Sequence, residues 1–402
     1  MKIVNSSQIH NETPAGLPPA APRKTRFQES WELLKKNKLA FLGLLIFVLF
    51  FFTALIFVLF FFTALAGIIL TSGTNPYFDP STVRLQEKLR PPLSDPNLKT
   101  LRPEETPKLG LYLFGTDDLG RDVFARMLQG AWVSLTVGFV AVGIAVLIGI
   151  FLGGIAGYFG QNHICLHHIL VTLILFIGVV LLSIGNMYLG LTCLITGIVC
   201  ILYYLLMKKR SVKKAQSIWL QMLHKKAISV DTLIMRVVDI MLCFPSFFLI
   251  LTVVALLPAS IYNIMIVIGL TSWMGTTRFV RAEFLSLREQ DFVTAVKALG
   301  ISNLRIIFRH MVPNAIAPVL VSATIGIATA ILTEAGLSFL GFGVPPPYAT
   351  WGNILSDGKR FIFDAPWLTF VPGFAILIVV LSFNLFGEGL RDILNPKLRE
   401  RY

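Results

Sequence analysis

The sequence predicts an all-α, polytopic membrane protein with eight membrane-spanning helices. Of its 402 residues, 55% are hydrophobic and only 14% are charged, whereas soluble chains typically carry about 25% charged residues. Several apolar runs reach the roughly 20 residues that a helix needs to cross a bilayer. The net charge of +13 is distributed in short blocks beside these runs. This placement fits the positive-inside bias of cytoplasmic loops better than a nucleic-acid-binding patch, so we expect no nucleic-acid partner.

Residues 1–38 are expected to form a cytoplasmic N-terminal leader without a cleavable signal. The stretch 1–22 is rich in Pro, Ala and Ser, which is typical of disorder. The basic stretch 23–38 fits either an amphipathic surface helix or a plain solvated segment. Because no cleavage site follows the next apolar run, that run is predicted to be a membrane anchor.

The first predicted span, residues 39–70, contains the same ten residues twice in tandem. IFVLFFFTAL occupies 46–55 and again 56–65. As a helix the run would be about 48 Å long, against a hydrocarbon core of about 30 Å. We therefore expect one copy to be excess, with the helix loosely packed and either tilted or projecting from the bilayer.

Residues 71–130 are predicted to form an extracytoplasmic loop with charges of both signs. It ends in GTDDLGRDVFARMLQGAW, where 121–129 is predicted to be an interfacial helix. Asp117, Asp118 and Asp122 could bind a cation, but pairing with Arg121 and helix capping are the favoured interpretation.

The second predicted span covers 131–158, within a core segment 131–162. Gly149, Gly153 and Gly157 follow one another at four-residue spacing. This spacing places the glycines on one face of a helix and predicts a close helix–helix contact rather than a lipid-facing surface.

Residues 163–229 are predicted to be an inserted hairpin of two spans followed by a basic strip. The strip 208–226 contains no acidic residue, which places that side in the cytoplasm. HICLHH at the start of the insert offers His163, Cys165, His167 and His168 as metal ligands. Polar residues at the membrane interface are the favoured alternative, since no matching ligand cluster occurs elsewhere. The four cysteines form no CxxC pair, so no disulfide framework is expected.

The remaining spans are predicted at 230–257, 261–277, 314–340 and 368–386. Arg236 and Asp239 lie three residues apart in the first of these, a spacing that favours a pair on one helical face. The basic tail 392–402 and the leader would then both lie in the cytoplasm.

The polar segment 283–313 separates two of these spans and is predicted to be two short helices joined at Gly300. Gly300 is a candidate C′ residue, and Ser302 is a candidate N-cap. Ile301 and Ile306 are placed as a hydrophobic staple, and Pro313 is expected to end the unit.

Five motifs in this sequence resemble one family. FVTAVKALGISNLRIIFRHMVPN is similar to the cytoplasmic EAA loop of permease subunits of binding-protein-dependent ABC importers. GTDDLGRDVFARMLQGAWVSLTVG, VDTLIMRVVDIMLCFPSFFL, TEAGLSFLGFGVPPP and WGNILSDGKR resemble the dipeptide/oligopeptide (OppC/DppC-like) branch. The resemblance covers about 30–160 and 230–400, and leaves 163–229 without a counterpart.

This resemblance implies a type I ABC importer permease core of six helices, 131–162 and 230–391 together with the first span, plus the inserted hairpin. It implies that the EAA loop docks into a groove on a cytoplasmic ATPase. The matching positions are Thr294, Ala295, Val296, Ala298, Leu299, Gly300, Ile301 and Pro313. Threonine stands at 294 where the family has glutamate, so a salt bridge from this position is not expected.

The family further implies a second permease subunit, two ATPase subunits and an extracytoplasmic binding protein as partners, with membrane lipid around the spans. The sequence has no GxxxxGK[ST] phosphate loop, so we expect a non-catalytic subunit of a peptide importer in a bacterial cytoplasmic membrane, with no cofactor. A nickel or small-solute importer is the nearest alternative. An ion-coupled carrier or a membrane-embedded enzyme fits less well, because repeated span groups and converging catalytic residues are lacking.

Overall fold

The computed structural model describes residues 56, 58–73, 76–160, 162–165, 187–209 and 226–394, with parts of 171–182. All of them belong to one compact unit, Thr53–Tyr402. The predicted leader 1–38, the first repeat copy 46–55 and the end of the tail lie outside the described residues. So do the candidate ligands His167 and His168 and most of the basic strip.

Within the described residues, three helices are long and apolar enough to cross a membrane. They are α3 (Val123–Tyr158), the continuous helix Asn303–Phe339, and Trp367–Arg391 within α15 (Trp367–Leu394). A bent pair, α7 (Val230–Leu242) and α8 (Ser246–Leu256), can count as a fourth span. Three shorter apolar helices accompany these: Val58–Thr71, Met187–Val199 and α9 (Ile261–Thr271). The prediction of a helical membrane protein is therefore confirmed, while the count of eight spans stays a prediction.

The predicted span over 230–257 is bent, because α7 and α8 meet at an angle of 79°. Pro245 occupies the N-cap of α8 and lacks the amide hydrogen that a continuous helix would use. Its ring also disfavours helical geometry at Phe244, the residue before it. The span is therefore broken at a position that the sequence marks.

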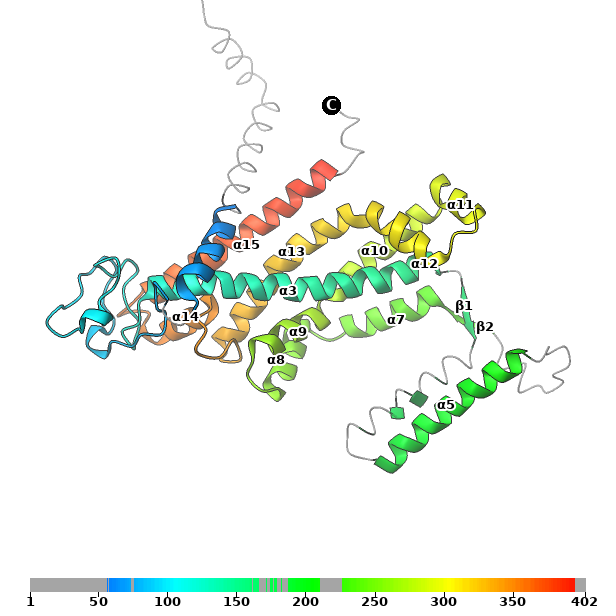
Figure 1. The fold of residues 1–402 in the computed structure, drawn as a ribbon, viewed down its shortest axis with the longest axis horizontal. Helices are drawn as coiled ribbons and strands as arrows, with labels where there is room; N and C mark the ends of the chain where they lie inside the picture. The colour runs from blue at the N-terminus through cyan, green and yellow to red at the C-terminus, as the bar shows by residue number, and fades with distance from the viewer. Residues whose placement is uncertain are drawn as a thin grey trace, which may run out of the picture. The chain divides into compact units, whose positions relative to one another are not determined.

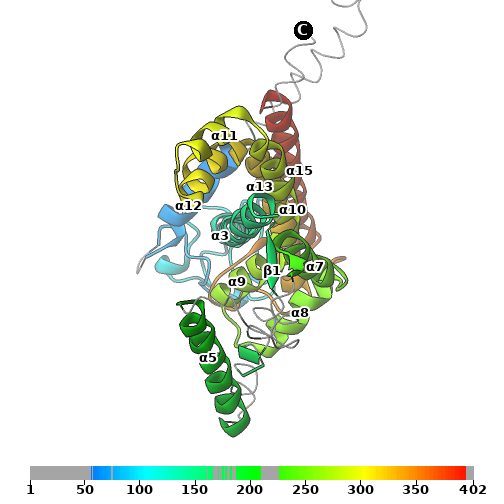
Figure 2. The ribbon, with the colours of Figure 1, turned by 90° about the vertical axis from the view of Figure 1, so that its right-hand side faces the viewer.

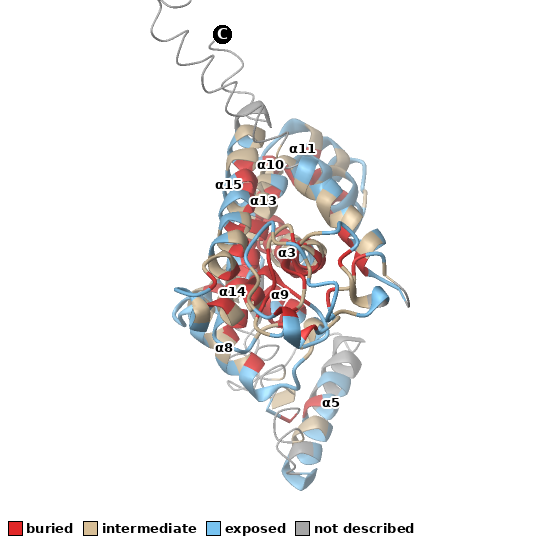
Figure 3. Cartoon of the chain, turned by 90° about the vertical axis from the view of Figure 1, so that its left-hand side faces the viewer, coloured by how far each residue is buried: buried red, intermediate tan, exposed pale blue. Residues whose placement is uncertain are grey.

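Helix α3 lies among α9, α10 (Trp273–Arg288) and α13 (Val312–Phe339) (Figures 1 and 2). The buried residues of Figure 3 concentrate on these helices. The main hydrophobic cluster joins side chains such as Val137 and Ile268 to Ile331 and Val379. Burial of this apolar surface by protein is what fixes the helix arrangement.

The glycines Gly149, Gly153 and Gly157 are all buried and face α10. A Cβ atom at Gly157 would lie 2.5 Å from the Cβ atom of Phe284, and one at Gly149 would lie 2.7 Å from that of Thr276. Only hydrogen fits at such positions, so the absence of side chains sets the separation of the two helices.

One end of α3 is closed by buried charged groups, and we call it the α14 end, after α14 (Trp351–Gly358). Asp117 accepts hydrogen bonds from Arg121 Nε at 2.7 Å and from Arg126 NH1 at 2.5 Å. Asp357 of α14 accepts a second bond from Arg126, at 2.9 Å. Residues 123–129 are helical as predicted, but they are not a separate helix, because α3 begins at Val123 and runs on without interruption.

Asp122 is the N-cap of α3, and its carboxylate accepts a hydrogen bond from the Phe124 amide. Burial raises the pKa of the Asp122 carboxyl, while the bond from Phe124 opposes that shift. The interpretation as ion-pairing and capping groups is therefore correct for Asp117 and Asp122. Among the described residues no group of His, Cys, Asp and Glu could hold a metal ion.

The inserted region departs from the all-α prediction at its base. Strand β1 (His163–Cys165) pairs antiparallel with β2 (Lys226–Ser229), His163 lying opposite Ser229. Helix α5 (Met187–Lys209) belongs to the predicted hairpin, and its described apolar side chains are largely exposed, Tyr188 by 91%. The two ends of the insert therefore meet in a two-stranded ladder.

Candidate functional site

The segment 283–313 forms the other end of the bundle, which we call the α11 end (Figure 1). The chain leaves α10 at Arg288, starts α11 (Asp291–Ala298) after an extended Gln290, and enters α12 (Asn303–Arg305). The prediction of one helix from 283 to Gly300 is wrong, because the backbone turns at Glu289–Gln290. Neither residue is a glycine or a proline, so the sequence carries no clear signal for this break.

Gly300 ends α11 as a C′ residue, as the sequence predicts. Its φ is +71°, in the left-handed region that favours glycine. The Gly300 amide donates to the carbonyl of Lys297 at 3.0 Å, and the Ile301 amide donates to that of Val296 at 3.3 Å. These two bonds form a Schellman motif, and Ile301 and Val296 pack against the same cluster.

The start of the next helix agrees with the sequence only in part. Ser302 occupies the N-cap, but its side chain makes no capping hydrogen bond. Ile306 is fully buried and Ile301 packs against the same cluster, as expected of a staple. Pro313 does not end the unit: it lies in the first turn of α13, after a π-helical turn, Ile306–Met311. That turn shifts the hydrogen-bond pattern next to the proline, so the helix continues from Asn303 to Phe339.

The underside of α11 and α12 is anchored in a second hydrophobic cluster. Val293 of α11 and Met311 are buried there with Phe284 of α10 and Tyr158 of α3. The Tyr158 hydroxyl donates to Asn303 Oδ1 at 2.8 Å. The ammonium of Lys297 lies 5.1 Å from the centroid of the Tyr158 ring, within cation–π range. The loop is therefore packed against three helices of the bundle.

The opposite face of the loop is exposed and partly apolar, and we call it the coupling surface. It comprises the predicted residues Thr294, Ala295, Ala298, Leu299 and Gly300, all of which are exposed. Leu299 is 77% exposed. Val296 and Ile301 are half-buried beneath this surface, and Pro313 is exposed at the start of α13.

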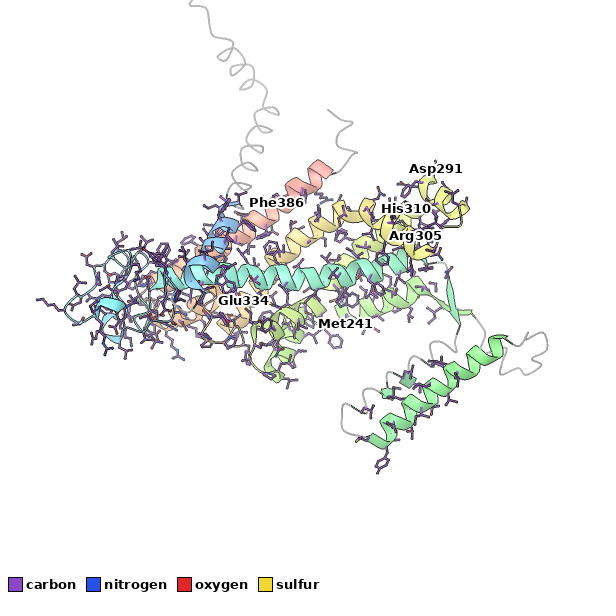
Figure 4. The ribbon with its side chains drawn as sticks, in the orientation of Figure 1. Met241, Asp291, Arg305, His310, Glu334 and Phe386 are labelled. Carbon is purple, nitrogen blue, oxygen red and sulfur yellow. The ribbon has the colours of Figure 1, made fainter. Side chains whose placement is uncertain are left out.

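The rim of the coupling surface is polar and basic. Leu304 and Phe308 continue the exposed apolar area, 64% and 51% exposed respectively. Arg305 and His310 follow on the same helical run, and Asp291 opens α11 (Figure 4). An exposed apolar patch with a charged rim is typical of a protein interaction site.

A polar cavity of about 460 Å³ adjoins the coupling surface. Its lining includes Thr294 and Lys297 of α11, Arg288 of α10, Tyr158 and Asn303. The Thr294 hydroxyl donates to the carbonyl of Asp291 at 2.8 Å and so stays within its own helix. Sequence reasoning missed Tyr158 and Asn303, which come from helices far apart in the chain.

Two ion pairs connect α10 to α7 near this end. Arg281 binds Asp231, and Arg278 NH2 lies 2.7 Å from Asp239 Oδ1. The predicted pairing of Arg236 with Asp239 is wrong, because the cation across the helix interface is better placed than the neighbour in sequence. The α11 end therefore includes a polar contact between α10 and α7.

Comparison with known proteins places this geometry in a family. Residues 218–400 match the family described as "Binding-protein-dependent transport system inner membrane component". The chain is 35% identical to the dipeptide transport system permease protein DppC of Alkalihalophilus pseudofirmus, over 93% of this chain and 90% of the relative. It is 31% identical to the oligopeptide transport system permease protein OppC of Bacillus subtilis, over 91% and 88%.

A further relative, the dipeptide transport system permease protein DppC of Haemophilus influenzae, is 32% identical over 94% of this chain and 97% of its own length. Among solved structures, the inward-facing MetNI methionine ABC transporter matches with a TM-score of 0.42 and 14% identity, over 68% of this chain and 98% of that one. The relatives at 31–35% identity are all named as transport permeases. The chain belongs to the family of binding-protein-dependent transport system inner membrane components, together with the DppC and OppC permeases.

Proposed function

We propose that this protein is the transmembrane permease subunit of an ATP-driven ABC importer that carries di- and oligopeptides across the bacterial cytoplasmic membrane. The relatives are named as dipeptide and oligopeptide transport permeases, which supports the peptide substrate. The observation that carries the mechanism is the coupling surface, an exposed apolar face fixed to three helices.

In the proposed mechanism the coupling surface docks into a groove on a cytoplasmic ATPase subunit. Leu299 is the apolar anchor, and Ala295, Ala298 and Gly300 allow close approach because they are small. Arg288 and Lys297 form the polar rim. Threonine at 294 supplies no carboxylate, and its hydroxyl is hydrogen-bonded within α11. Closure of two ATPase subunits would move α11, and the buried cluster would pass this movement to α3, α10 and α13.

The remaining features of the assembly are proposals of the same kind. The architecture is that of a type I importer permease, six core spans plus the inserted hairpin, with both termini in the cytoplasm. A second permease subunit completes the pore, and an extracytoplasmic binding protein delivers the peptide. Lipid surrounds the hairpin, and ATP is hydrolysed by the partner ATPases rather than by this chain.

The docking role is tested by placing a charge on the coupling surface. Leu299→Asp should leave the permease folded, because the side chain is 77% exposed, but should prevent co-purification of the ATPase subunits. Phe363→Asp is the matched control, since Phe363 is 97% exposed and follows α14. Co-purification and peptide uptake into proteoliposomes are measured for both variants.

We expect ATPase association and uptake to be lost with Leu299→Asp and kept with Phe363→Asp. Gly300→Pro should act like Leu299→Asp, because proline cannot adopt the φ of +71° found here. Retention of the ATPase and of uptake in both α11-end variants would contradict the proposed docking.

A further inference from the structure

A cavity of about 830 Å³ lies between α10, α13 and α15. Its lining carries two carboxylates, a guanidinium and two amides: Glu283 on α10, Asn314 on α13, and Asn384, Glu388 and Arg391 on α15. The volume falls within the roughly 300–1,000 Å³ of typical small-molecule sites. The coupling surface does not account for this cavity.

The charges on α15 lie in its last turns, at one end of the candidate span. Glu388 lies within the candidate span Trp367–Arg391 and is exposed. Further along the same stripe of α15 the exposed side chains are apolar, with Phe374 57% and Leu381 52% exposed. Ionisable groups facing hydrocarbon are costly and mark water-filled or substrate-bearing surfaces. The inner part of α15 therefore faces water.

The charged side chains of the cavity have no ionic partner among the described residues. None of the ion pairs between described residues involves Glu283, Glu388 or Arg391. Two carboxylates and one guanidinium thus remain available to a ligand. A ligand with a positively charged group at one end and a negatively charged group at the other would pair with both the carboxylates and the guanidinium.

The walls of the cavity continue into the coupling surface. Glu283 lies in the last part of α10, whose end leads into α11. Asn314 lies in the first turn of α13, directly after the π-helical turn. A movement of α11 that is shared by α10 and α13 would therefore displace Glu283 and Asn314 relative to Glu388 on α15.

We propose that this cavity is a peptide-binding site, in which Glu283 and Glu388 bind the α-ammonium group and Arg391 binds the α-carboxylate. Asn314 and Asn384 supply amide groups for the peptide backbone. The inference rests on the proposed function, because a transported peptide with free ends is the zwitterion that these groups fit. Arg391 and the two amides make the lining unlike a site for a lone metal cation.

The test measures dipeptide binding to the complete transporter in lipid nanodiscs, without the binding protein. The probes are dialanine, N-acetyl-dialanine and dialanine amide, titrated by calorimetry. The double variant Glu283→Gln, Glu388→Gln should weaken dialanine binding at least about tenfold, because two charged hydrogen-bonding partners of the ammonium are neutralised. Binding of the N-acetyl form should be weak in the wild type and unchanged in the variant.

Arg391→Gln should weaken dialanine but leave dialanine amide unchanged. Asp95→Asn, a change at an exposed carboxylate outside the cavity, should leave all affinities unchanged. If the wild-type complex imports dialanine but does not bind it without the binding protein, or if the variants bind like the wild type, the inference is wrong while the proposed function stands.

Two further outcomes would also overturn the inference. Loss of the second permease subunit from the purified double variant would assign the cavity to the subunit interface. Absence of ATP-driven uptake of any peptide by the wild-type complex would remove the proposed function, and this site with it.

Discussion

At the α14 end of α3, charged side chains are buried against one another, whereas at the α11 end apolar side chains are left exposed. Asp117 is fully buried and Arg126 is 3% exposed, and both have partners within the chain. Leu299 is 77% exposed and Leu304 is 64% exposed, with no cover from the described residues. At the α14 end, the charged groups are therefore paired within the chain. At the α11 end, the exposed apolar side chains offer a surface to another protein.

This difference in burial shows which contacts stabilise each end. A buried ion pair holds its place only if every charge keeps a partner, so the α14 end depends on internal contacts. The α11 end is rigid because of its underside, while its exposed face contributes little to folding. Mutations at the two ends should therefore separate stability from assembly.

The largest effect on stability is expected from Asp117→Ala. This change leaves Arg126, whose side chain is 4% exposed, with Asp357 as its remaining ionic partner. We expect a loss of about 3 kcal/mol, the lower end of the range for breaking a buried pair. Unfolding of the purified permease in detergent mixtures measures it.

Glu289→Gln is the matched control at the α11 end. Glu289 pairs with Arg288 at 2.9 Å, but its side chain is 74% exposed, so the loss should stay below about 1 kcal/mol. Equal losses at the two ends would show that the comparison between them is wrong.

A smaller effect is expected from Gly157→Ala in the contact between α3 and α10. The new Cβ atom would lie 2.5 Å from that of Phe284 and 2.9 Å from the carbonyl oxygen of Arg281. Overpacking of this kind costs about 1–3 kcal/mol. The thermal midpoint of the purified permease should fall accordingly.

Gly143→Ala on the same helix provides the control, because nothing lies within 4 Å of its Cβ position. Alanine is a better helix former than glycine by about 1 kcal/mol in water, so Gly143→Ala should be neutral or slightly stabilising. A fall in the midpoint of the same size for both variants would contradict the assignment of the Gly157→Ala effect to the contact with α10.

The smallest effect is expected from deletion of 56–65, the second repeat copy. Phe60 and Ala64 pack against the main cluster, but after the deletion the identical residues of 46–55 would stand at the same distance from Gly67. Those contacts would be restored, and the span predicted from the sequence over 39–70 would be shorter by about 15 Å. Uptake and stability should be unchanged; failure to assemble would show that the first helix needs its full length.

The sequence predicted much of the α11 end because the relevant signals are local. Gly300 was identified as a C′ residue, and its φ of +71° and two hydrogen bonds agree. The break at Gln290 was not predicted, since no glycine, proline or capping side chain marks it. Pro245, by contrast, does mark the bend between α7 and α8.

The partners at the α14 end could not be predicted, because they are distant in sequence. Asp357 binds Arg126 across 231 positions, and no periodicity relates the two. For the same reason Asp239 was assigned to Arg236, three residues away, instead of to Arg278. Spacing along one helix identifies neighbours on its face, but it does not show which cation a neighbouring helix brings closer.

The glycines of α3 also restrict how α10 could travel along it. Thr276, Val280 and Phe284 recur every four residues and lie against Gly149, Gly153 and Gly157, which have the same spacing. A displacement of α10 along α3 would bring these side chains against larger residues until they reached the next glycine, about 6 Å away. Sliding of α10 along α3 is therefore stepwise rather than continuous. In a small displacement of α11, α10 and α3 would have to move together as one rigid body.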